Sequence, residues 1–360
     1  MAVNRKHLVI ITVLLCALSV FDAAAQKPAP AKPGPTPKKE TKEKEKEVKE
    51  KEDVWAFPSP PSPPNARFPR SYESEQTTEK FIAVEPDVSI KLCVSDGNLK
   101  VNGWERNEVR VFVRSGRLPG FKVLEKDEKS GKANWLLVAN QRPEGARPGP
   151  MPECLAGEIE MDVPIGSGLS LTGRGANTEI DSIKKVSVKT ADGHISLKSI
   201  PGGIAASTYQ GNLEVVNSGG AIALETTTGN ITAFDVSPGQ IGDLFRAKSN
   251  GGNVSLQQVE HRQIEASSIT GSVNFNGKFL PGGLYNFKTS NGSIRMLIPL
   301  KSSATIKANY GFGTFNSEIP LKFVYESKNP GGQNFQATMG SGEANINLIT
   351  NTGVIAIKKL

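Results

Sequence analysis

The chain has 360 residues, with 43 Lys and Arg against 36 Asp and Glu, and a formal net charge of +7 at pH 7. A mildly basic surface favours anionic polymers or lipids, or is simply a solvated lysine-rich exterior, and without an aromatic and basic platform it argues against nucleic acid. With three cysteines and three histidines, the chain contains no Cys-x-x-Cys or Cys/His spacing, so we expect no metal and no cofactor.

Residues 1–25 have the features of a signal peptide. Two basic residues, Arg5 and Lys6, precede an apolar run over 8–20, and an A-x-A pattern ends the segment. The run is too short to cross a bilayer comfortably, and no later segment resembles a membrane helix. We expect an exported protein, located in the periplasm, at the cell surface or outside the cell, with no transmembrane segment in its mature form.

Residues 26–80 are rich in Pro, Lys and Glu and are predicted to form a disordered linker. Such a composition cannot bury enough apolar surface to offset the entropy of ordering, and its prolines stiffen it. The linker would hold the folded body away from its point of origin, or would serve only as a solubilising tail.

Residues 81–170 are predicted to form an N-terminal β cap and a first rung, meaning one coil of a stacked β structure. The rung is expected over 88–101, and three longer strands are expected over 108–114, 134–139 and 158–163. These strands would cover the end of the stack, which would otherwise expose an open sheet edge.

Residues 171–360 carry a repeat that is clearest from Val186 onward. Around a turn glycine at position 0, apolar residues recur at −7, −5, +2 and +4, and a Ser or Thr recurs at −3. The turn glycines are Gly97, Gly193, Gly211, Gly229, Gly252, Gly271, Gly292 and Gly353. The hydroxyl residues are Thr172, Thr190, Thr208, Thr226, Ser249, Ser268, Thr289 and Thr350.

Alternation with period two places all five repeated positions on the inward faces of two successive strands. The pattern predicts an all-β, single-stranded β-solenoid of the β-helix or β-roll type, with about eight to ten rungs of about 18–23 residues. Glycine would supply a positive φ and the hydroxyl would satisfy a buried turn, so both are structural residues. A degenerate rung is expected around Gly313, and a turn of another rung over 329–332.

Two cysteines, Cys93 and Cys154, remain in the mature chain. An even number in an oxidising compartment permits one disulfide, and this pair is our candidate; two buried or loop thiols are the alternative.

No catalytic constellation is evident. His194 occupies a polar turn position and His261 has no Ser or Asp pattern that would form a triad. The acidic residues Asp181, Asp192, Asp235 and Asp243 occupy different positions of the rung and should not converge. The glycine-rich segments lack the spacing of calcium-binding repeats. Trp104, Trp135 and Tyr209 are aromatic residues that could contact a ligand, although packing is the commoner role.

The segments 95–104, 109–111 and 161–164, followed by the repeated Thr-x-x-Gly-Asn-Ile, resemble a widespread bacterial β-strand-repeat family of unknown function that is called adhesin-like. The resemblance covers about residues 81–360. It implies a right-handed β-solenoid that is exported or associated with the envelope, and it brings no catalytic residues with it.

Our first hypothesis is an exported, non-enzymatic adhesin-like module that binds an envelope glycan or protein. The second is a structural or stress-related scaffold of the cell envelope. The third, a polysaccharide-active β-helix enzyme, is an outlier because the chain shows no nucleophile or paired acids.

Overall fold

The structure is a computed structural model that describes residues 77–114, 117–141, 153–239, 243–329 and 332–360. The predicted signal peptide and nearly all of the predicted linker lie outside these ranges. The first strand, β1, begins at Thr77, four residues before the predicted start of the folded region. The described residues are all-β, as predicted, and none of them is helical. Accordingly, no helix in these ranges could cross a membrane.

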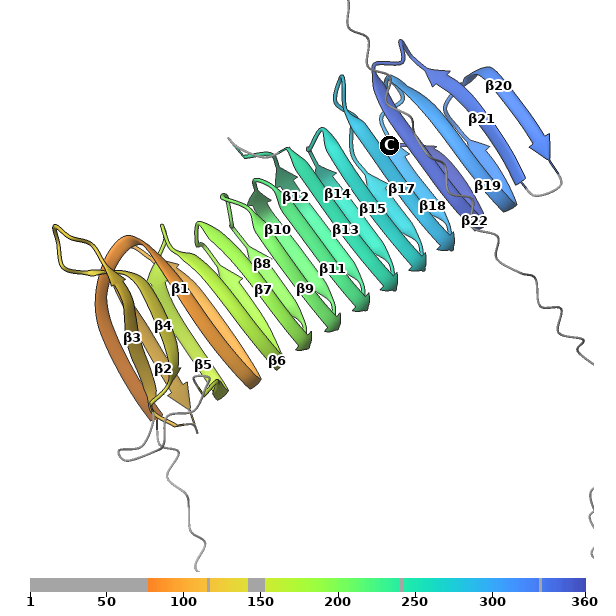
Figure 1. The fold of residues 1–360 in the computed structure, drawn as a ribbon. Helices are drawn as coiled ribbons and strands as arrows, with labels where there is room; N and C mark the ends of the chain where they lie inside the picture. The colour runs from red at the N-terminus through yellow and green to blue at the C-terminus, as the bar shows by residue number, and fades with distance from the viewer. Residues whose placement is uncertain (1–76, 115–116, 142–152, 240–242, 330–331) are drawn as a thin grey trace, which may run out of the picture. The chain divides into compact units, whose positions relative to one another are not determined.

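Most strands belong to two parallel sheets, to which each rung adds one strand in turn (Figure 1). The order in the first sheet is β4 (Ala133–Asn140), β1 (Thr77–Trp104), β6 (Gly168–Asp181), β7 (Lys185–Asp192), β9 (Ile204–Gln210), β11 (Ile222–Thr228), β13 (Leu244–Gly251), β15 (Gln263–Thr270), β17 (Leu284–Asn291), β22 (Ala344–Lys359) and β19 (Ala304–Ser317).

The second sheet contains β5 (Leu155–Pro164), β1, β6, β8 (Ile195–Lys198), β10 (Leu213–Gly219), β12 (Ile231–Ser237), β14 (Val254–Val259), β16 (Val273–Asn276), β18 (Ile294–Ile298), β22 and β19. The long strands β1, β6, β19 and β22 therefore pass through both sheets.

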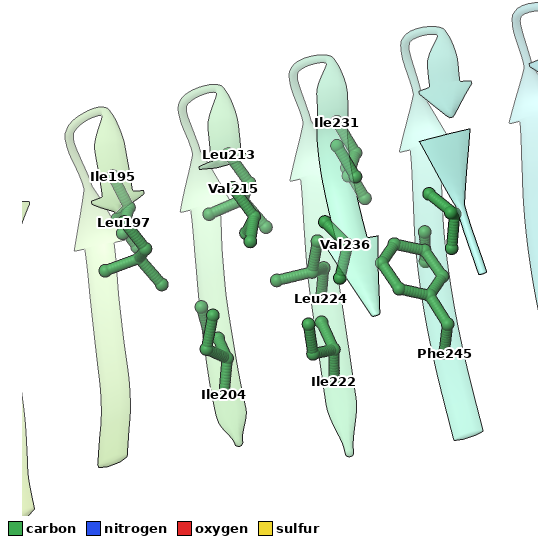
Figure 2. Close-up of a cluster of buried hydrophobic side chains, with 14 of the residues drawn as sticks. Ile195, Leu197, Ile204, Leu213, Val215, Ile222, Leu224, Ile231, Val236 and Phe245 are labelled. Carbon is green, nitrogen blue, oxygen red and sulfur yellow. The ribbon is translucent and has the colours of Figure 1, made fainter. Parts of the chain in front are cut away.

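The core lies between the two sheets and follows the repeat. Leu213 pairs with Ile195 on one side and with Ile231 on the other, and each of the three is at most 1% exposed. Figure 2 shows these side chains aligned from rung to rung. Burial of such a side chain contributes about 1.5–3 kcal/mol, so the stack gains stability from a continuous interior rather than from single rungs. Farther along, aromatic residues fill the same interior, among them Phe275 and Phe287.

The hydroxyl residues also stack in the predicted register, with one exception. Thr190, Thr208, Thr226, Ser249, Ser268, Thr289 and Thr350 pair in succession and are buried. Thr172 was expected to begin this column, but it is exposed and pairs with Lys189. Gly173 faces Thr190 instead, since a Cβ on Gly173 would lie 2.9 Å from the Thr190 Cγ2 atom. The column therefore begins at Thr190.

At the N-terminal end, the three predicted strands occur as β2 (Glu108–Arg114), β4 and β5, and the sequence did not reveal β3 (Pro119–Lys126). The expectation that all three strands cover the end of the stack differs from the structure in one respect. β4 and β5 run parallel to the two halves of β1 and form a rung that precedes it. Antiparallel pairing begins only beyond them, where β3 joins β4 and β2 joins β5 and β1.

At the C-terminal end, the last repeat in the sequence is not the last rung in space. β22 pairs with β17 and β18 on one side and with β19 on the other. The degenerate rung expected near Gly313 is β19, with Gly313 opposite Gly353. The turn expected near 329–332 belongs instead to an antiparallel hairpin of β20 (Lys322–Asn329) and β21 (Gly332–Met339), and β21 also pairs with β19.

Candidate functional site

The turn glycines form a column, and close approach of the backbone explains it. A Cβ on Gly211 would overlap the carbonyl oxygen of Gly193, and the same holds for each later turn glycine and the one in the rung before it. The expectation that every glycine supplies a positive φ was incomplete. Gly97, Gly193, Gly211, Gly229, Gly271 and Gly353 have a φ in the left-handed region, whereas Gly252 and Gly292 do not. Contact between rungs is therefore the common cause.

Next to the glycines, polar residues form a ladder of hydrogen bonds along the second sheet. The backbone N–H of Asn230 donates to the Asn212 Oδ1 atom at 2.8 Å, and that of Asn253 donates to Asn230 in the same way. His194 belongs to this amide ladder, because its Nδ1 atom accepts the N–H of Asn212 at 3.0 Å. This role requires Nδ1 to be unprotonated and makes His194 a structural residue.

His261 is fully buried in the structure. Its Nε2 atom lies 2.7 Å from the carbonyl oxygen of Gly220, and its ring packs against Phe245 with centroids 5.7 Å apart. Desolvation by burial lowers its pKa, opposed by the Gly220 carbonyl and the Asp243 charge. The histidine is therefore held neutral inside the stack.

Cys93 and Cys154 form a disulfide, with Cα atoms 4.6 Å apart. Cys93 lies in the middle of β1 and Cys154 directly precedes β5. The bond therefore joins the β4/β5 rung to the β1 rung.

The four aspartates singled out in the sequence lie apart. Asp181 ends β6, Asp192 ends β7, Asp235 lies in β12, and Asp243 accepts a hydrogen bond from the backbone of Arg262. Within the part of the chain that the structure describes, no three His, Cys, Asp or Glu residues are placed to hold a metal ion.

A groove of about 790 Å³ crosses the outer face of the first sheet at its N-terminal end. Trp135 on β4 is its aromatic wall and is 45% exposed. The polar lining residues come from the strands β1, β3, β4, β6 and β7 and from the turn after β3. The charged ones are Glu85, Asp87, Glu125, Asp127, Lys91 and Lys185. We call this depression the Trp135 groove. Four carboxylates against two ammonium groups give it an excess of negative charge.

The acidic rim of the Trp135 groove is held in place by its own turn. Asp127 accepts the backbone N–H groups of Lys129 and Ser130 at 2.9 and 2.8 Å, which lowers the pKa of its carboxyl group. Glu85 accepts the hydroxyl of Ser130. The Asn134 Oδ1 atom is buried without a hydrogen-bond partner, while its Nδ2 atom lies 3.4 Å from Glu125. The rim thus offers ordered acceptors beside an aromatic face.

A second groove, of about 750 Å³, lies on the outer face of the second sheet. Glu160, Lys100 and Glu179 lie on the neighbouring strands β5, β1 and β6 and line it, together with Phe112 of β2. Sequence reasoning missed these glutamates. They occupy position +3 of the repeat, which faces outward between the two buried apolar positions +2 and +4. This fixed position in the repeat could have identified them from the sequence.

The three aromatic candidates differ in their surroundings. Trp104 is packed, since its Nε1 atom donates to the carbonyl of Glu108 at 2.8 Å and Arg106 lies over its ring. Tyr209 on β9 is 58% exposed but lines neither groove. Trp135 alone of the three combines exposure with a concave polar surround.

Comparison with known proteins finds one family model that matches part of the chain. Residues 181–358 match the family model described as Toastrack DUF4097. This match confirms the predicted resemblance to a β-strand-repeat family. No curated protein matches the chain.

Two solved structures are similar to the chain. One is a "putative cell adhesion protein" from Clostridium sporogenes ATCC 15579, at 14% identity and a TM-score of 0.26, over 79% of this chain and 100% of that one. The other is a "putative adhesin" from Bacteroides fragilis NCTC 9343, at 14% identity and a TM-score of 0.32, over 80% of this chain and 98% of that one.

Proposed function

We propose that this chain, in which residues 181–358 match the Toastrack DUF4097 family model, is an exported, non-enzymatic binding module of the adhesin-like type that acts at the cell envelope or surface. The observation that carries the proposal is the Trp135 groove, in which an exposed indole stands beside fixed carboxylates on a rigid sheet. A concave site with one aromatic wall and a few convergent polar groups is the usual form of a ligand site.

The ligand that this groove fits is a glycan. A sugar ring presents an apolar face that can stack on an indole, while its hydroxyl groups donate to carboxylates such as that of Glu125. The excess of carboxylates around Trp135 favours neutral or amino sugars over anionic polymers. The basic charge of the whole chain pointed toward anionic polymers, but the charges at the groove favour the opposite class.

The test is a binding titration of the purified protein with oligosaccharides of glucose, glucosamine and glucuronate. Trp135→Ala should weaken binding of the preferred sugar by about tenfold, because loss of a central aromatic contact costs at least about 1.4 kcal/mol. Tyr209→Ala is the matched control, since Tyr209 is an exposed aromatic of the same sheet outside both grooves. Its affinity should equal that of the unchanged protein.

Equal losses in the two variants, or none in Trp135→Ala, would reject the Trp135 groove as the site. Strongest binding of glucuronate oligomers would reject the proposed ligand class. Cleavage of any oligosaccharide during the titration would contradict a non-enzymatic role.

Export is supported by the signal-peptide pattern of residues 1–25 and by the disulfide, a bond that persists in oxidising compartments. We assign the solenoid a right-handed coil, because connections between parallel strands are right-handed in the great majority of folds. We also propose that β2 and β3 act as the N-terminal cap, since their antiparallel pairing ends the repeat.

A structural role in the envelope is the second candidate. The amide ladder supports it, because each of these side chains accepts the backbone N–H of the next rung in the turns that precede the strands of the second sheet. Incubation with purified envelope fractions distinguishes the two. If the protein is a scaffold, the envelope fractions should retain it and its Trp135→Ala variant equally. If it is a glycan-binding module, the fractions should retain the variant less than the unchanged protein.

A further inference from the structure

The second groove crosses neighbouring strands of the second sheet from β2 to β10, and we call it the Glu160 groove. Part of its lining follows the outward position +3 of the repeat and the side chain in register with it on β2. In the order in which the strands pair, these residues are Phe112, Glu160, Lys100, Glu179, Ser196 and Glu214. They form one row that runs across the strands.

Carboxylates alternate with hydrogen-bond donors along this row. Glu160, Glu179 and Glu214 lie on every second strand, whereas Lys100 and Ser196 lie on the strands between them. Since neighbouring strands are about 4.8 Å apart, successive carboxylates are about 9.6 Å apart. The groove therefore presents acceptors and donors with a regular period.

These side chains are available to a ligand. Within the ranges that the structure describes, the side chains of Glu160 and Lys100 form no hydrogen bond or ion pair, although Glu160 is half-buried. Glu179 forms an exposed ion pair with Lys198 at 3.2 Å, and the hydroxyl of Ser196 makes only a long contact of 3.5 Å with the next glutamate of the row. A ligand can replace contacts as weak as these.

We propose that the Glu160 groove binds a peptide rich in lysine and proline, in the polyproline II conformation and with a lysine at every third residue. This helix has about three residues per turn and rises about 3.1 Å per residue, so every third side chain lies on one face at intervals of about 9.3 Å. The interval matches that of the carboxylates. Four glutamates against Lys100 and Arg114 also give the groove the excess of negative charge that a cationic peptide needs.

The donors between the carboxylates fit the backbone of the same peptide. A polyproline II helix has no internal hydrogen bonds, so its carbonyl groups are free to accept them. Lys100 and Ser196 lie between the contact points of successive peptide lysines and donate to these carbonyl groups. Phe112, at one end of the row, supplies the aromatic surface on which such peptides pack their proline rings. This arrangement gives a lysine a place in a groove for a cationic ligand.

Two synthetic peptides with equal numbers of lysines test the spacing. In fluorescence anisotropy titrations of the purified protein, a peptide of repeated Lys-Pro-Pro should bind at least about tenfold more tightly than one of repeated Lys-Pro-Pro-Pro. The second peptide has the same charge, but its successive lysines are about 12.4 Å apart and lie on different faces. Equal affinities would mean that charge alone attracts the peptides, and the proposal would be wrong.

Glu160→Gln tests the location. It should weaken binding of the Lys-Pro-Pro peptide about tenfold, because it removes a charge-assisted hydrogen bond. Glu225→Gln is the matched control, since Glu225 is an exposed glutamate of the first sheet that lines neither groove. This control and Trp135→Ala should both bind the peptide like the unchanged protein. Equal losses in the two glutamate variants would reject the Glu160 groove, and a loss in Trp135→Ala would place the peptide in the other groove.

Lys100→Met tests the donor role through the sign of its effect. If the Lys100 ammonium only repels the peptide, its removal should tighten binding. Because we assign it a hydrogen bond to a peptide carbonyl, we expect the affinity to fall about fivefold. Tighter binding by Lys100→Met would contradict the proposed arrangement. Binding of glucosamine oligomers that is lost in Glu160→Gln, without binding of either peptide, would assign the groove to an amino sugar instead.

Discussion

The Thr226 hydroxyl donates a hydrogen bond to the carbonyl oxygen of Gly211, one rung earlier, at 3.0 Å. The same contact recurs from Ser249 to Gly229, Ser268 to Gly252, Thr289 to Gly271 and Thr350 to Gly292. Each of these carbonyl groups also occupies the space that a Cβ on the next turn glycine would need. The hydroxyl and glycine positions of the repeat are therefore two parts of one contact between rungs.

Gly252→Ala should strongly destabilise the protein. The added Cβ would overlap the Gly229 carbonyl oxygen, and because Gly252 has no left-handed φ, the effect isolates packing from backbone conformation. We expect a loss of about 3 kcal/mol in the free energy of unfolding, measured by urea denaturation. The neighbouring Gly251→Ala is the control, since its Cβ would lie 3.7 Å from the nearest atom, the Thr227 carbonyl oxygen. Similar losses in both variants would show that the rungs adjust to the extra methyl.

Thr289→Val should lower the free energy of unfolding by about 1–2 kcal/mol, because it leaves the Gly271 carbonyl without the 2.7 Å bond it now accepts. Thr190→Val is the matched change in the same column. The Thr190 Oγ1 atom is buried with no hydrogen-bond partner, so replacing it with a methyl should be neutral or stabilising. Chemical denaturation of both variants checks this, and equal losses would rule out the hydrogen bond as the cause.

Stability should fall in mild acid because of His261. Its pKa in the folded state is lowered, first by burial, so below about pH 6.5 the unfolded chain takes up a proton that the folded chain does not. This destabilisation by His261 is absent above that pH. It grows as the pH falls, by at most about 1.4 kcal/mol in the free energy of unfolding per pH unit.

His261→Gln should remove this part of the pH dependence, since glutamine can still donate to the Gly220 carbonyl but does not titrate. The measurement is urea denaturation at about pH 7.5 and about pH 5. Parallel stability curves for the two proteins would mean that other groups account for the acid sensitivity.

Removing the disulfide should destabilise the N-terminal rungs. The bond closes a loop across a separation of 61 residues, and the chain-entropy estimate for such a loop is about 4 kcal/mol. The Cys93→Ser and Cys154→Ser double variant should therefore melt at a lower temperature than the oxidised protein, as followed by circular dichroism. The unchanged protein after reduction should melt like the double variant, and a reductant should not affect that variant. An unchanged melting temperature would contradict the expectation.

The sequence was enough to predict the rungs between Val186 and Thr289, because period two fixes which side chains face inward and glycine marks each turn. It did not predict their spatial order at the ends. Nothing in the pattern of Ile346, Leu348 and Thr350 states whether that rung follows β18 or β19, since either neighbour offers the same backbone and a similar apolar surface.

The candidate site was less accessible to prediction than the fold. Trp135 could be named as a candidate, but the groove around it is made by Asp87, Asp127 and Lys185, which come from separate strands and a turn. β3 carries Glu125 and was missed, because its irregular register interrupts the alternation that signals a strand. Sites of this kind depend on which strands become neighbours, and the repeat does not specify that for the strands outside it.

The placement of β22 constrains how the molecule can be assembled. β22 fills the gap between β17/β18 and β19, so the β20–β21 hairpin and β19 can join the stack only after residues 344–359 have been synthesised and have inserted there. A premature stop before Ala344 would remove an internal rung and not the outermost strands. It would leave β17 and β18 on one side and β19 on the other without the strand that pairs with both.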